Sequence, residues 1–202
     1  MNRSRSWCLV CTVLAVLLAS EAGGAYAQHL TLVDLDKSAI TFVSKQMGVP
    51  VEGKFGKFSV QLAFDPAKPN EGKVRVELDV ASIETGSDEA NDEVKGKGWF
   101  DVKNHPRARF MSSSVKSLGA NRYELAGKLS IKGRTKEVVA PFTFKPAGLG
   151  AVFDGAFALK RLDYGVGEGV WSDTDTVADE VQVKFRITAT SEAPKKMNGG
   201  LR

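Results

Sequence analysis

Few side chains in this sequence are of the kinds that catalyse reactions or bind metals. The two histidines, His29 and His105, lie far apart in the chain, and the two cysteines, Cys8 and Cys11, both lie in an apolar N-terminal segment. A histidine-dependent triad or a zinc site would have to bring these residues together from unrelated places. The sequence therefore predicts no catalytic residue, no metal site and no cofactor.

Two segments near the C-terminus are similar to ligand-binding loops but lack their defining residues. The four acidic residues of 173–180 suggest a calcium site, yet the glycine and the closing glutamate of a calcium loop are absent. The glycines of 165–169 suggest a phosphate cradle, yet no Lys-Ser or Lys-Thr pair follows them. We interpret the two segments as a solvated acidic turn and a wide turn between strands, braced by an Arg161–Asp163 pair.

The basic residues do not indicate a nucleic-acid-binding protein. Without the N-terminal Arg3, Arg5 and Glu21, the chain has 26 basic and 23 acidic residues, and these are interspersed. The three cations of 132–136 form a local cluster that has the charge to meet a lipid phosphate or a membrane surface. A solvated turn is the alternative interpretation, because exposed lysines in turns usually contact neither a lipid phosphate nor a membrane surface.

The first 27 residues predict a signal peptide. Arg3 and Arg5 precede an apolar segment at 7–19, and Ala25-Tyr26-Ala27 is a small-residue cleavage site. The apolar segment is shorter than the roughly 20 residues of a membrane-spanning helix, although an uncleaved anchor remains the alternative. We predict cleavage after Ala27 and a periplasmic protein. The mature chain would have no cysteine and would be stabilised by packing alone.

The elements that would position a binding site are β-strands. Residues 123–131 alternate apolar and polar side chains, a turn with Gly133 follows, and residues 138–144 resume the alternation, which predicts an antiparallel hairpin. The same period predicts six further strands, near 40–46, 58–64, 74–80, 110–114, 152–162 and 181–189. Between the third and fourth strands, Ser87 or Asp88 is placed to cap a short helix through 89–94.

Eight strands at short spacing predict an all-β domain over residues 28–190, folded as an eight-stranded antiparallel barrel, followed by a disordered tail at 191–202. A two-sheet sandwich is the structural alternative. The inward positions mix bulky side chains with small and polar ones, which favours a hollow interior. A filled barrel with glycines at bends is the alternative. The small and polar inward residues are Gly127, Ala140, Gly155, Ser44, Gln46 and Ser112.

An ordered set of short motifs runs through most of the predicted domain, from about residue 34 to residue 190. They are Phe42 with KQMGV at 45–49, GKFGKF at 53–58, Phe64-Asp65, ASIETG at 81–86, WFDV at 99–102, GKLSIKG at 127–133 with Thr135-Lys136, and DYGVG at 163–167. In this order they make the chain resemble the YceI family of exported, lipocalin-like polyisoprenoid-binding proteins. The chain departs from that family at Gln46, where a histidine is common.

The resemblance implies a barrel around an apolar tunnel that holds a long isoprenoid, an isoprenoid quinone or a fatty-acid derivative, without catalysis. The partners it implies are this lipid and a transient contact with a membrane or a membrane redox protein. A filled-barrel interaction module and a lipid-modifying enzyme are the alternative functions. Strand alternation assigns to the tunnel wall Phe42, Val60, Leu62, Phe64, Val76, Leu78, Phe110, Leu125, Leu129, Phe142, Phe157, Leu159, Val183 and Phe185. Phe55, Phe58 and Trp99 are assigned to the mouth, with a plug beneath the helix as the alternative for Trp99.

Overall fold

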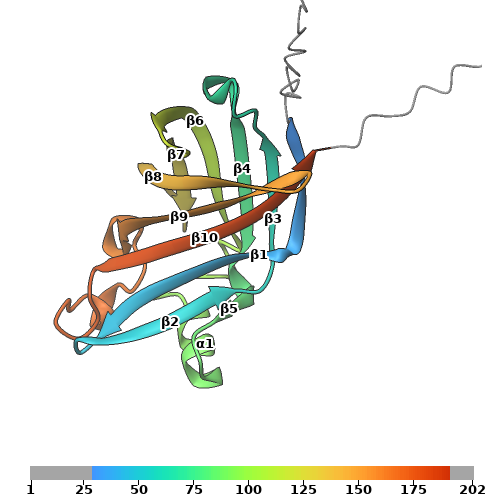
Figure 1. The fold of residues 1–202 in the computed structure, drawn as a ribbon. Coiled ribbons are helices and arrows are strands. Elements are labelled where there is room, and N and C mark those ends of the chain that lie inside the picture. The colour runs from blue at the N-terminus through green and yellow to red at the C-terminus, as the bar shows by residue number, and fades with distance from the viewer. Residues whose placement is uncertain (1–28, 192–202) are drawn as a thin grey trace, which may run out of the picture.

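The computed structural model describes residues 29–191, which form one curled antiparallel sheet with a short helix at one end (Figure 1). The predicted signal peptide at 1–27 lies outside these residues, as does the chain after Ser191. The strands are β1 (Leu30–Gln46), β2 (Val49–Phe55), β3 (Phe58–Ala63), β4 (Lys73–Asp79), β5 (Ile83–Glu84), β6 (Arg107–Gly119), β7 (Arg122–Ile131), β8 (Arg134–Ala147), β9 (Gly150–Lys160) and β10 (Glu180–Ser191). Their order in the sheet is β3-β4-β6-β7-β8-β9-β10-β1-β2-β5.

The helical segments all lie between strands. The α-helix α1 (Asp88–Lys95) follows β5, and it begins as predicted, because the Ser87 side chain accepts a hydrogen bond from the backbone N–H of Ala90. Short 3₁₀ turns are η1 (Pro69–Glu71), η2 (Val80–Ser82), η3 (Arg161–Tyr164) and η4 (Gly169–Trp171). Figure 1 places α1 at the end of the sheet opposite to the start of β1 and the end of β10.

The hairpin predicted at 123–144 is confirmed as β7 and β8. Ten residue pairs join the two strands, from Arg122–Thr143 to Ile131–Arg134. Lys132 and Gly133 form the two-residue turn with φ of 48° and 74°. Positive φ at both central residues is typical of the turns whose twist matches that of a β-hairpin.

The structure has ten strands in one sheet, where eight were predicted, and the sandwich alternative is wrong. One missed strand, β2, contains Pro50 and Gly53, which lower its strand propensity. It forms because Met47 and Gly48 make a tight turn that sets it in register against β1. The other, β5, has only two residues, which is too short for any alternation to show.

The first strand is also longer than predicted, because β1 begins at Leu30 and residues 30–34 pair with β10, so this segment is not a lead-in. A register shift between Asp34 and Ala39 bends β1, and the start of β1, which is still paired with the end of β10, also reaches the β3 edge of the sheet. There Leu30 and Phe64 exchange backbone hydrogen bonds of 2.9 and 3.2 Å. The sheet is thus a half-barrel in which the start of β1 meets the β3 edge at one end.

Candidate ligand-binding cavity

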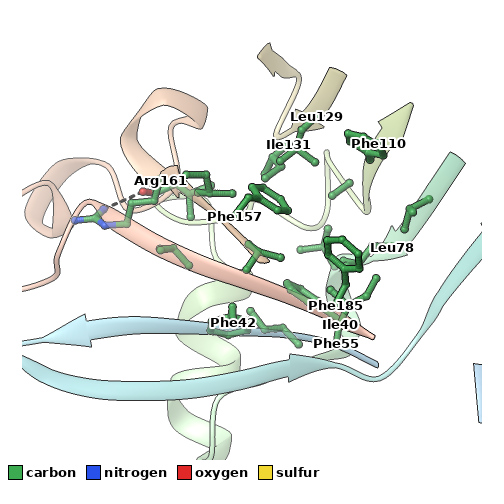
Figure 2. A pocket seen from close by; sticks show the side chains of 18 of the residues that line it. Ile40, Phe42, Phe55, Leu78, Phe110, Leu129, Ile131, Phe157, Arg161 and Phe185 are labelled. Carbon is green, nitrogen blue, oxygen red and sulfur yellow. Dashed lines mark hydrogen bonds between the residues drawn. The ribbon is translucent and has the colours of Figure 1, made fainter. Parts of the chain in front are cut away.

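The half-barrel encloses a cavity of about 630 Å³ that is lined mainly by apolar side chains. Its lining comes from both halves of the curled sheet and from α1 (Figure 2). Figure 2 shows Leu129, Phe110 and Leu78 on one side and Phe42, Phe55 and Phe185 on the other, with Phe157 between them. A volume of this size is within the range of protein sites for small molecules.

One end of the cavity is closed by an aromatic floor, which consists of Phe64, Phe142 and Phe153. The ring centroids of Phe64 lie 5.3 Å from those of Phe153 and 6.3 Å from those of Phe142, in edge-to-face arrangements. Tyr123 and Phe144 pack behind the floor and do not line the cavity. The floor lies at the end of the sheet where Leu30 of β1 and Phe64, just after β3, exchange backbone hydrogen bonds, and its three rings are buried there.

The other end has a mouth between the end of β1 and helix α1. Gln46, Glu89 and Glu93 line the cavity in this region and are exposed to solvent, and the exposed Arg109 at the start of β6 lines the cavity as well. The Trp171 indole N–H donates a 2.8 Å hydrogen bond to the Glu93 carboxylate and so links η4 to α1 across this region. The cavity therefore has an apolar, closed end and a polar, open end.

Beside the mouth, the buried Arg161 holds together the segment 161–179. Burial lowers the pKa of its guanidinium from the ordinary value, and the nearby Asp179 opposes this shift. The predicted pair with Asp163 is wrong, because all the guanidinium hydrogen bonds go to backbone carbonyls. Nε donates to Ala178 at 3.1 Å, Nη1 to Val166 at 2.9 Å and Gly167 at 2.8 Å, and Nη2 to Trp171 and Val177 at 2.7 Å each.

Gly167 is a glycine because the guanidinium packs against it. A Cβ at this position would lie 2.2 Å from Arg161 Nη1, and the residue has φ of 76°. The glycines of 165–169 therefore form the wide turn that the sequence predicts. What they enclose is the Arg161 side chain.

Trp99 lines the cavity and packs against Trp171 and Arg161. Its ring lies 5.6 Å from the Trp171 ring and 5.6 Å from Arg161 Cζ. Its indole N–H is buried and has no hydrogen-bond partner among the described residues. Close by, burial together with the charge of Asp163 raises the pKa of Tyr164 to about 12.

The basic hairpin tip is engaged with the same segment. Lys132 Nζ donates to the carbonyl oxygens of Lys97 and Gly165 and to the Glu168 carboxylate, and Arg134 donates to Glu168 at 2.7 Å. The hydrogen bond from Lys132 is the main reason why the pKa of Glu168 lies below its ordinary value. Lys132 and Arg134 thus fasten the β7–β8 turn to the rim, and neither faces the cavity.

All the predicted wall and mouth residues line the cavity except Phe58, which packs between two buried clusters. The prediction missed the contribution of α1, where Ala90 and Val94 line the cavity beside the two glutamates. The i, i+4 spacing of Ala90 with Val94, and of Glu89 with Glu93, is the signal that could have found this face. Ser112 is not in the lining, because its hydroxyl accepts a hydrogen bond from the Val74 backbone.

The inward glycines are not the source of the hollow. A Cβ on Gly155 would lie 2.3 Å from a Phe185 ring atom, and one on Gly127 would lie 2.5 Å from a Phe110 ring atom. The space beside each glycine is therefore filled by a ring from the neighbouring strand. The cavity results from the curvature of the sheet around this wall.

Comparison with known proteins gives the chain a family. A family model described as a YceI-like domain matches residues 32–189. The UPF0312 protein of Pseudomonas syringae pv. tomato is 30% identical over 187 residues, which cover 87% of this chain and 97% of the relative. The chain belongs to the YceI family. The predicted resemblance is therefore confirmed.

Solved structures agree with a YceI fold. BcnA of Burkholderia cenocepacia has 49% sequence identity and a TM-score of 0.77, and the match covers 78% of this chain and 99% of BcnA. A Campylobacter jejuni YceI protein gives 0.65 at 21% identity, covering 71% and 86% of the two chains. A polyisoprenoid binding domain from Saccharophagus degradans gives 0.62 at 14% identity, covering 81% and 99%. At these two lower identities the likeness concerns the fold alone.

The described part of the YceI chain, residues 29–191, contains no helix with the length and apolar character needed to cross a membrane. It also contains no group of three or more His, Cys, Asp or Glu side chains placed to hold a metal ion.

Proposed function

We propose that this protein is an exported carrier that sequesters a long apolar ligand inside the cavity without a catalytic step. The ligand is a polyisoprenoid, an isoprenoid quinone or a fatty-acid derivative. The observation that carries the proposal is the shape and chemistry of the cavity, which is apolar, closed at the aromatic floor and open at a polar mouth. The polyisoprenoid binding of the Saccharophagus degradans neighbour is consistent with this ligand class.

The binding energy follows from burial of the tail. Each buried methylene contributes about 0.8 kcal/mol, so one five-carbon isoprene unit contributes roughly 4 kcal/mol before its ordering cost. A few units are therefore enough for tight binding without a charged clamp. The ligand contacts that we propose are the predicted wall and mouth residues other than Phe58, together with Ala90 and Val94 of α1.

The polar groups of the lining support binding without catalysis. Arg161 uses its donors on backbone carbonyls, and Glu89 and Glu93 lie at the solvent-exposed mouth. A buried acid or base beside the tail is what a lipid-modifying enzyme would require. The filled-barrel alternative would require side chains to occupy the space that the cavity takes.

The proposed location is the periplasm, because the first 27 residues have the pattern of a cleaved signal peptide. The carrier domain would then be residues 28–190. Loading and release would involve transient contact with a membrane or a membrane redox protein, because a long prenyl chain has little solubility in water.

Native mass spectrometry tests the carrier proposal on protein purified from its host. We expect a co-purifying mass of several hundred daltons, which lipid extraction and mass analysis would then identify. Protein that carries no such mass and also fails to take up an added prenyl alcohol would refute the proposal.

A further inference from the structure

We propose that a docking edge beside the mouth inserts into the surface of a phospholipid bilayer whose head groups carry no net charge. The docking edge consists of Met47 in the β1–β2 turn, Val49 at the start of β2 and Val170 of η4. This inference rests on the proposed carrier function and names the surface through which the ligand is loaded. The contact would turn the mouth toward the membrane, so that the ligand passes between bilayer and cavity without crossing water.

The three side chains of the docking edge are unusually exposed for apolar residues. Val170 is 87% exposed, Met47 73% and Val49 63%. Among the described residues, Leu149 is the other large apolar side chain with comparable exposure, at 76%, and it lies at the opposite end of the sheet beside Ser191. Single exposed apolar residues are ordinary, but a group of them beside a cavity indicates an interaction site.

The turn that carries Met47 has a geometry that favours other residue types. Met47 and Gly48 have φ of 48° and 77°, and turns of this kind prefer asparagine, aspartate or glycine at both positions. Two other turns with positive φ at both residues, Ala120-Asn121 and Lys132-Gly133, begin with a small or a charged side chain. Met47 thus places a long apolar side chain in solvent at a strained position, which is expected where the side chain has a function.

Hydrogen bonds bring η4 next to the β1–β2 turn. The Met47 backbone N–H donates to the Thr176 carbonyl at 2.9 Å. Arg161 Nη2 donates to the carbonyls of both Trp171 and Val177 at 2.7 Å each, which holds η4 against the segment that Met47 contacts. Figure 1 shows the β1–β2 turn beside the orange segment 161–179, away from the chain ends. One flat surface can therefore contact both parts of the docking edge.

The docking edge leads directly into the cavity lining. Val49 has the same strand parity as Val51, which lines the cavity. Gln46 precedes Met47 and lines the mouth, and Trp171, the residue after Val170, lines the cavity as well. Tryptophan is also favoured at the boundary between lipid and water. Insertion of the docking edge would therefore place the mouth at the bilayer surface.

Charge and area favour a neutral bilayer as the partner. Residues 46–51 contain no charged side chain, Glu52 offsets Lys45 beside the turn, and Glu89 and Glu93 make the mouth acidic. Anionic membranes attract clusters of lysine and arginine, which this arrangement lacks. Three side chains expose at most a few hundred Å², whereas a specific protein interface buries about 1,000 Å² or more. A reversible membrane contact needs only a shallow apolar insertion.

Vesicle flotation of the predicted mature chain, residues 28–202, tests the inference. The vesicles are phosphatidylcholine, alone or with added phosphatidylglycerol. We expect the wild type to bind the neutral vesicles, with no loss in high salt and no gain from phosphatidylglycerol. The double variant Met47→Asn with Val170→Ser should bind at least about tenfold more weakly. It should fold normally in urea titrations, because asparagine suits the turn and Val170 is exposed.

The matched control is Leu149→Ser, which removes an equally exposed apolar side chain from the turn between β8 and β9. It should bind vesicles like the wild type. Uptake of a prenyl alcohol separates docking from carriage. The double variant should take up the alcohol from solution like the wild type, but at least about fivefold more slowly when the alcohol is supplied in phosphatidylcholine vesicles.

Wild-type protein that takes up the alcohol from solution but does not bind neutral vesicles would overturn the inference and leave the carrier function intact. Binding that requires phosphatidylglycerol, or an equal loss in Leu149→Ser, would also overturn it. A wild-type dimer that the double variant dissociates would show that a second copy covers the docking edge instead. If the alcohol is not taken up from solution either, the carrier function itself is refuted.

Discussion

Narrowing the middle of the cavity should weaken lipid uptake by an amount that depends on which residue is enlarged. Leu129 on β7 and Phe157 on β9 both line the cavity, and Figure 2 shows both side chains directed toward it. Leu129→Trp adds six non-hydrogen atoms, which take the room of about one isoprene unit. Losing one buried unit costs at most about 4 kcal/mol, and new contacts with the indole recover part of this.

We therefore expect Leu129→Trp to weaken binding of a four-unit prenyl alcohol by about 2 kcal/mol, which is roughly 30-fold. Phe157→Trp adds only three atoms, so we expect about 1 kcal/mol, or roughly fivefold. The measurement is titration calorimetry or probe displacement, with urea unfolding to confirm that each variant is folded.

The control for this experiment is Val139→Trp, because Val139 lies on β8 of the same hairpin but points to solvent. It should bind lipid like the wild type. Folded Leu129→Trp protein with unchanged uptake, or a loss in Val139→Trp as large as that in Leu129→Trp, would show that the inward face of β7 has been assigned wrongly.

Three further predictions concern stability. Arg161→Met should lower the free energy of unfolding by about 3–5 kcal/mol in urea titrations, because the buried carbonyls lose their donors, and Arg161→Lys should recover only part. Wild-type stability in Arg161→Met would contradict this. Gly155→Ala should cost about 1–3 kcal/mol and reduce lipid uptake, because the added Cβ forces the Phe185 ring to move. A Gly155→Ala variant with wild-type stability and lipid uptake would show that the Phe185 ring does not lie against Gly155. The Tyr164 pKa is raised to about 12, so the folded state keeps a proton that the unfolded state loses above about pH 10. The free energy of unfolding should therefore keep its full value below about pH 10 and fall by about 2 kcal/mol as the pH rises to 12. Tyr164→Phe should remove this dependence of the unfolding free energy on pH.

The sequence predicts well where local pattern decides the structure. The alternation of 123–144 identifies the hairpin because both strands have one face on the cavity side and one in water. The Ser87 cap is readable because its side chain bonds to the backbone three residues later. The wall residues follow from the same period, since a strand that keeps its register keeps its inward face.

The sequence predicts poorly where distant residues decide the structure. Nothing local marks Val49–Phe55 as a strand, because its pairing partner β1 overrides Pro50 and Gly53. The pattern presents the inward glycines as gaps, because the rings that fill the space beside them come from neighbouring strands. The five carbonyl partners of Arg161 are likewise brought together by a loop, not by a repeating pattern.

The two ends of the half-barrel are stabilised by different means, and this difference gives the cavity one closed end and one open end. At the closed end, strand pairing satisfies the hydrogen-bonding groups of the backbone, and packed aromatic rings fill the interior. At the open end, segment 161–179 is not paired across its length, and the Arg161 guanidinium satisfies its carbonyls in place of a neighbouring strand. Because that charge is fully used by the backbone, it presents no free donor to the lining. A mouth can therefore be held open beside an apolar interior without placing an unpaired cation against that interior.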